Sequence, residues 1–143
     1  MKARKAREFL QQVRKRDCIV NNKMIERDQW KAMATSATAP MGGERVQTSG
    51  SQQRMADAVG RYVDIEAQIN EYIDQLYNAK RDVLAVIERL DVREYDLLHK
   101  VYIQYIPLAE LAVIYDCSYS SITTTHGRAL QHVEEILNER ETE

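Results

Sequence analysis

Apolar residues recur at alternating intervals of three and four between positions 54 and 90, the spacing of the a and d positions of a coiled coil. The members of this apolar seam are Tyr62, Ile65, Ile69, Tyr72, Leu76, Ala79, Val83, Val86 and Leu90. A helix over this segment would be roughly 55 Å long at 1.5 Å per residue. Because so long an apolar seam must be shielded from water, a second helix has to cover it. That helix is either another part of this chain, folded back antiparallel, or a second copy of the chain.

The segment before the seam offers one such helix. Positions 3–34 are predicted to be helical, with lysine and arginine around a loose apolar face formed by Phe9, Leu10, Val13, Val20, Met24 and Trp30. A connection from Thr35 to Gln52 follows, rich in glycine, serine and threonine, which is long for a compact domain. Residues 1–90 are therefore predicted to form a long, coiled-coil-like helical hairpin with its loop at about 35–52.

Within that loop, Gly42-Gly43-Glu44-Arg45 could offer backbone donors and a cation to a phosphate or an acidic partner. A simple linker is the favoured interpretation of the same residues. The sequence leaves the role of the loop open.

Charge is unevenly distributed, although the net charge is only −2. Residues 1–54 hold 12 Lys and Arg against 5 Asp and Glu, whereas residues 91–143 hold 4 against 10. Since neutralisation of phosphates supplies most nonspecific affinity for DNA, the N-terminal helix is expected to supply much of that affinity.

Several classes of protein are not expected. No apolar run reaches the ~18 residues of a membrane span. Cys18 and Cys117 are isolated and fit no zinc spacing, which suits a reducing, cytoplasmic setting. Cys117 with His126 and His132 lacks a fourth metal ligand. No nucleophile motif, P-loop or metalloprotease motif occurs, so we expect no enzyme activity, no cofactor and no metal.

The stretch from Pro107 to Val133 is typical of a helix-turn-helix. Apolar positions of a first short helix (Leu108, Leu111, Ala112 and Tyr115) are followed by those of a second (Ile122, Ala129, Leu130 and Val133). Asp116 would supply the left-handed turn residue, and Ser118 would cap the second helix. Ala112 and Ile122 should be buried where the helices cross, because only a small residue allows that approach. Close backbone packing would explain Gly127. An ordinary helical hairpin is the alternative.

The preceding segment, 91–106, is predicted to be one helix. Asp91 would cap it and Glu94 would reach back to complete a capping box. Its inward positions would be Tyr95, Leu98, Val101, Tyr102 and Tyr105. Pro107 should end this helix and serve as the first residue of the next.

The segment from Leu90 to Leu137 resembles region 4 of bacterial sigma-70 factors. The resemblance is carried by Leu108-Ala-Glu-Leu-Ala112, Tyr115-Asp-Cys-Ser118, Ile122 and Arg128-Ala-Leu130. The chain as a whole, loop included, resembles small phage and prophage proteins of Gram-positive bacteria that are related to late-gene and autolysin regulators. The resemblance implies an all-α fold in which residues 91–143 form a helix-turn-helix domain that binds promoter DNA and RNA polymerase.

The expected DNA-contacting residues are mostly hydroxyl-bearing. They are Ser118, Tyr119, Ser120, Ser121, Thr123, Thr124, Arg128 and Lys100. In sigma factors, Arg and Glu usually stand at the start of the recognition helix. In this chain, none of the residues at the start of the corresponding helix offers the bidentate arginine–guanine contact.

Two functions follow. The first is a phage-type transcriptional regulator that binds double-stranded DNA through the C-terminal helix-turn-helix. The alternative is a protein–protein interaction module that docks on RNA polymerase or a phage protein without reading bases, which the acidic C-terminal third favours. A homodimer through the long helix is a further expectation.

Overall fold

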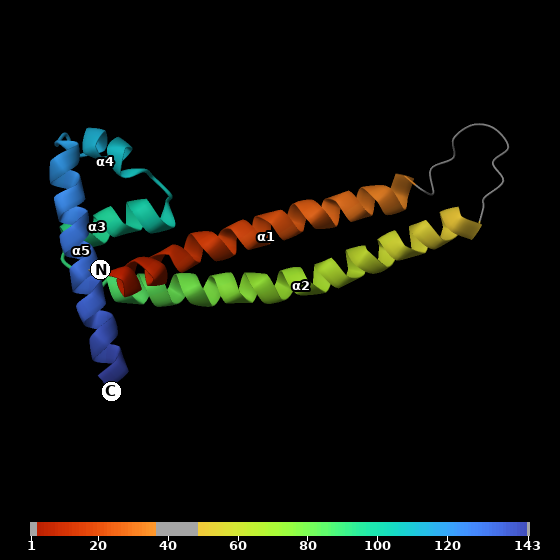
Figure 1. The fold of residues 1–143 in the computed structure, drawn as a ribbon, viewed down its shortest axis with the longest axis horizontal. Coiled ribbons are helices and arrows are strands. Elements are labelled where there is room, and N and C mark those ends of the chain that lie inside the picture. Colours follow the sequence, from red (N-terminus) through yellow and green to blue (C-terminus); the bar gives the residue numbers. More distant parts are fainter. Residues whose placement is uncertain (1–2, 37–48, 143) are drawn as a thin grey trace. The chain divides into compact units, whose positions relative to one another are not determined.

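The computed structural model describes residues 3–36 and 49–142, and these ranges are helical with no strand (Figure 1). In chain order the elements are α1 (Arg4–Ser36), α2 (Ser49–Ile87), α3 (Val92–Leu98), the π-helix η1 (His99–Ile103), α4 (Leu108–Ile114) and α5 (Tyr119–Thr142). In the described ranges no helix is both long enough and apolar enough to cross a membrane. The all-α prediction is confirmed. The loop residues Gly42-Gly43-Glu44-Arg45 lie outside the described residues.

The chain divides into two compact units, one formed by 1–17 together with 76–143 and the other by 18–75. A boundary was predicted between residues 90 and 91. The compact units divide within the two long helices, because the start of α1 and the end of α2 share a core with the C-terminal helices.

The first unit is built around α5. Its main core contains side chains from α1, α2, α3, η1 and α5: Ala6, Leu10, Val13, Val83, Val86, Ile87, Leu98, Tyr102, Ala129, Leu130, Val133, Ile136 and Leu137. Leu10 and Leu98 are fully buried, and Leu130 is 2% exposed. The first turns of α1 are thus an integral part of the C-terminal core.

A second, smaller core joins α4 to α5. It consists of Leu97, Leu111, Ala112 and Ile122. Ala112 is 7% exposed and Ile122 is 3% exposed, so the predicted burial of this pair is confirmed. Asp116 adopts a positive φ of 52° in the turn between the helices, as expected of the residue that reverses the chain.

The segment 91–106 differs from the prediction of one continuous α-helix. Asp91 does cap α3, because its carboxylate accepts a hydrogen bond from the Glu94 amide at 2.8 Å. The α-helix then ends at Leu98 and a π-helical turn follows, closed by the Gln104 amide on the His99 carbonyl at 3.1 Å. Tyr105 leaves this turn with φ 63°, and its hydroxyl donates to Asp17 at 2.8 Å.

Two local predictions in this region were wrong. Glu94 does not complete a capping box, because its carboxylate is buried and contacts His132 of α5 instead. Pro107 is the N-cap of α4 with extended dihedrals rather than its first helical residue. In both cases a tertiary or loop geometry replaced the purely local arrangement.

The second unit, 18–75, consists of the later turns of α1 and the earlier turns of α2, which run antiparallel beside each other (Figure 1). Val20, Ala58, Ile65 and Ile69 are buried there. Arg27 pairs with Glu66 at 3.5 Å, and the Arg61 guanidinium lies 5.9 Å from the Trp30 ring centroid.

The apolar seam is buried or half-buried along its whole length within the single chain. Of the four residues that typify it, Ile69 and Val83 are buried, and Tyr62 and Leu76 are half-buried. The prediction of one long helix with a covered seam is therefore confirmed for α2, although this helix ends at Ile87 rather than Leu90.

Candidate nucleic-acid interface

The first turns of α5 present a polar surface opposite the buried side of the helix. Ser118 precedes α5, and its hydroxyl oxygen accepts a hydrogen bond from the Ser121 amide at 3.0 Å. This is an N-cap, and it fixes where the helix begins. The helix N-terminus leaves amide groups directed outward, which favours an anion at this end.

The predicted contact residues are mostly solvent-accessible. The exposed ones are Ser118, Tyr119, Ser120, Ser121, Thr124 and Arg128. Ser121, Thr124 and Arg128 are three and four residues apart, so they share one face of α5. Thr123 departs from this pattern because it is half-buried, on the margin between the exposed and the packed face.

The threonine hydroxyls are already engaged in the helix. Thr123 and Thr124 both donate to the Ser120 carbonyl at 2.9 Å. A hydroxyl hydrogen that points at the helix backbone does not reach a phosphate oxygen, so these residues offer outward methyl groups and acceptor lone pairs. Their contact with DNA would therefore be to thymine methyls or base donors rather than to the phosphate backbone.

Of the predicted DNA-contacting residues, Lys100 is the least available for a phosphate contact. Its ammonium pairs with Asp96 at 2.5 Å and lies 5.7 Å from the Tyr115 ring centroid. The Tyr115 hydroxyl donates to the same carboxylate. The Lys100 and Tyr115 hydrogen bonds together lower the pKa of Asp96, because both stabilise its charged form. A cation held in this way is largely neutralised before any phosphate approaches.

Gly127 lies in open surroundings. A Cβ atom at this position would have no neighbour within 4 Å, so the expectation of close backbone packing was wrong. Nothing in the described structure requires glycine here, and its helical cost of about 1 kcal/mol relative to alanine is not offset by packing.

Two histidines of α5 make contacts with η1 and α3 that the sequence did not predict. Tyr102 and His126 share a hydrogen bond at 2.9 Å, and burial followed by the nearby Arg7 charge lowers the pKa of His126. On the next turns of α5, His132 Nδ1 contacts Glu94 Oε2 at 2.7 Å, and that hydrogen bond raises the pKa of His132. The pairs fix α5 to η1 and to α3.

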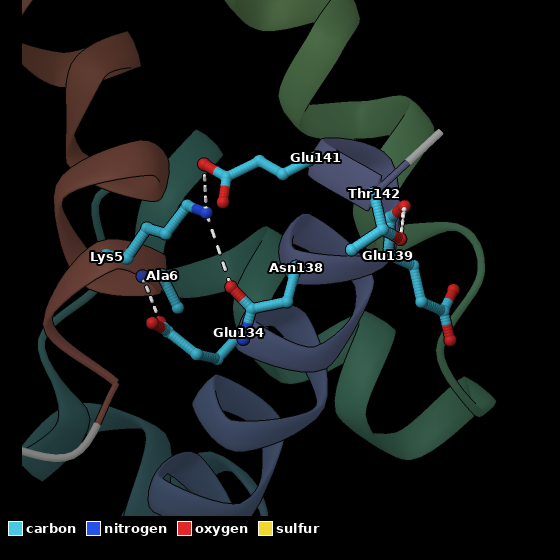
Figure 2. A network of polar contacts seen from close by, with 7 residues as sticks. All are labelled: Lys5, Ala6, Glu134, Asn138, Glu139, Glu141 and Thr142. Carbon is cyan, nitrogen blue, oxygen red and sulfur yellow. Dashed lines mark hydrogen bonds and ion pairs between the residues drawn. The ribbon is translucent and has the colours of Figure 1, made fainter.

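The C-terminal turns of α5 hold the start of the basic helix α1 (Figure 2). Glu134 accepts a hydrogen bond from the Ala6 amide at 2.6 Å, which satisfies a donor in the first turn of α1. Lys5 binds both Glu141 and Asn138. Because these contacts are specific, the basic turns of α1 belong to the same compact unit as the hydroxyl-bearing turns of α5.

Neither a family model, nor a characterised protein sequence, nor a solved structure matches this chain.

Proposed function

We propose that the chain is a phage-type transcriptional regulator that binds duplex DNA through the helix pair α4 and α5. The supporting observation is the geometry of that pair. A left-handed Asp116 turns the chain and a small Ala112 lies with Ile122 in the crossing, so the helix pair matches the expectations for a helix-turn-helix. The resemblance to sigma region 4 points the same way.

In this proposal α5 enters the major groove with its exposed face toward the bases. Thr124 and Ser121 supply methyl and hydroxyl contacts, and Arg128 meets the backbone further along. Exposed cations of α1, such as Lys15, add the salt-dependent part of the affinity.

A second candidate function rests on a different observation. The outward face of α4 carries two large apolar residues, Val113 at 80% exposure and Ile114 at 53%. Exposed apolar pairs of this kind are common in protein interfaces, and the charge of residues 91–143 repels phosphate. In this alternative, α4 docks on RNA polymerase or a phage protein and α5 reads no bases.

One pair of experiments separates the two functions. The full-length protein is used to select fragments of genomic DNA at low salt, and in parallel to capture purified host polymerase. Enrichment of a shared motif, lost with Thr124→Ala and Ser121→Ala together, supports the DNA-binding function. Val113→Ser with Ile114→Ser is the matched variant. If the Val113 and Ile114 substitutions abolish capture of polymerase, and the Thr124 and Ser121 substitutions change no DNA binding, the second function replaces the first.

A further inference from the structure

A pocket of about 290 Å³ opens beside the crossing of α4 and α5. It is lined by Arg93, Leu97, Tyr115, Cys117, Ile122 and Thr125. Leu97 and Ile122, at 1% and 3% exposure, give it an apolar base. The DNA-binding proposal uses Ser121, Thr124 and Arg128 on the exposed face of α5 and gives this pocket no role.

Most polar groups around the pocket are already satisfied. The Tyr115 hydroxyl donates to Asp96, and the Thr125 hydroxyl donates to the Ser121 carbonyl at 3.1 Å. Cys117 is a free, half-buried thiol, which is a weak hydrogen-bonding group. Arg93 differs from these, because its guanidinium is exposed and takes part in none of the ion pairs formed by the described residues around it, such as Lys100 with Asp96 and His132 with Glu94. The pocket therefore joins an apolar base to one unpaired cation.

We infer that this pocket binds a small carboxylic acid with an apolar body, such as an aryl carboxylate. A guanidinium matches the two oxygens of a carboxylate with parallel hydrogen bonds, whereas the apolar base of the pocket accommodates a ring or a short alkyl chain. An apolar cavity of about 150 Å³ admits benzene, so a pocket about twice that size suits a ligand of roughly ten non-hydrogen atoms.

Binding would stabilise the crossing of the two helices. The ligand would touch Cys117 in the turn and Ile122 in α5, and it would fill space that the protein leaves empty. A ligand that binds only the folded state raises the melting temperature, and the stabilisation grows with the logarithm of one plus the ratio of free ligand concentration to dissociation constant. This consequence is independent of DNA binding, so it is measurable whether or not the proposed function holds.

The test titrates full-length protein with benzoate, phenylacetate and hexanoate, and with their primary amides, in the absence of DNA. Calorimetry and thermal shift report binding. We expect the best acid to bind with a dissociation constant on the order of 1 mM. The matching amide should bind about 5- to 10-fold more weakly, because it lacks the charge that pairs with Arg93.

Three variants separate the site from nonspecific binding. Arg93→Gln should weaken the acid about 5- to 10-fold and leave the amide unchanged, whereas Arg54→Gln, in the other compact unit, should change neither. Thr125→Met should fill the pocket and remove binding of both. The melting temperature without ligand checks that each variant folds. Absence of saturable binding by every acid, equal affinity for acid and amide, or equal behaviour of Arg93→Gln and Arg54→Gln would each overturn the inference.

Discussion

The Tyr102 hydroxyl lies 2.9 Å from Nε2 of His126, and the two rings stack with their centroids 5.8 Å apart. The contact joins the π-helical turn to α5 beneath the exposed face of the helix. In the neutral tautomer that carries its proton on Nδ1, Nε2 of His126 accepts the hydrogen bond that Tyr102 donates. The pKa of His126 is lowered first by burial, which disfavours the charged imidazolium, and then by the nearby positive charge of Arg7.

The first prediction is a loss of stability in acid that depends on His126. Because the pKa of His126 is lower in the folded state than its ordinary value of 6.5, the unfolded state binds more protons as pH falls through that window. Stability therefore decreases as pH falls from 6.5 toward the folded pKa. His126→Gln should flatten this part of the profile, measured by thermal unfolding across pH.

The Glu94–His132 pair provides the opposite sign and serves as the control. The pKa of His132 is raised, so its contribution is fully present below 6.5 and is lost as pH rises through the folded pKa. Glu94→Gln should remove that alkaline-side loss and leave the acid-side loss intact. The effect is modest, because the His132 side chain is 49% exposed. Identical pH profiles for both variants would contradict the assignment.

The second prediction concerns the crossing of α4 and α5. Ala112→Leu should overpack the small core beside Ile122 and cost about 1–3 kcal/mol of unfolding free energy. The neighbouring substitution Val113→Leu is the control, since Val113 is 80% exposed and should change stability by no more than about 0.5 kcal/mol. Urea denaturation gives both values. Equal stability of the two variants would contradict the burial of Ala112 beside Ile122 where α4 and α5 cross.

The third prediction is that the C-terminal helices depend on the start of α1. Leu10 is fully buried in the main core with Leu130 and Val133, so Leu10→Ala should cost about 2–5 kcal/mol. Ile25→Ala, at a position 56% exposed, is the matched control. For the same reason a fragment of residues 91–143 should show little helix by circular dichroism. A fully helical fragment with a cooperative melt would refute this dependence.

The fourth prediction concerns DNA, and it uses substitutions because deleting residues 1–31 would remove core side chains such as Leu10. If the proposed function holds, Arg128→Gln and Lys15→Gln should each reduce the dependence of log affinity on log salt by about 1. Thr124→Ala should relax sequence preference and leave that slope unchanged. Fluorescence anisotropy over a salt series measures all three. If Thr124→Ala changes the salt dependence of affinity and the Arg128 and Lys15 variants do not, the assigned phosphate and base contacts are wrong.

The fifth prediction is self-association through α2. The predicted seam is shielded within one chain, but Val59, Val63 and Ile73 remain 47%, 56% and 39% exposed along an adjacent stripe of the helix. A second copy covering this stripe should make the protein a dimer, and Val63→Lys should shift it to monomer. Gln68→Lys, on another face of α2, should have no effect. Sedimentation that shows a monomer for the unchanged chain at high concentration would rule out the dimer.

Local signals in the sequence predicted most of the helices and several of their caps, although not the π-helical turn after Leu98 or the N-cap role of Pro107. The heptad spacing of Ile69 and Val83 predicted the buried face of α2, because a periodic apolar pattern depends only on helix geometry. Asp91, Ser118 and Asp116 were predictable for the same reason, since caps and left-handed turns are short-range preferences. The small Ala112 also indicated the crossing with Ile122.

Only the tertiary structure decided which hydrogen-bond partners several side chains use. Glu94 had a local partner available in a capping box, but burial beside His132 offered it a charged hydrogen bond. The π-helical turn places Tyr102 against His126 and is followed by Tyr105, which reaches Asp17, 88 residues away in sequence. Apolar periodicity carries no information about such distant pairs. The hydroxyls of Thr123 and Thr124 and the charge of Lys100, by contrast, are engaged by residues only three or four positions earlier in the sequence.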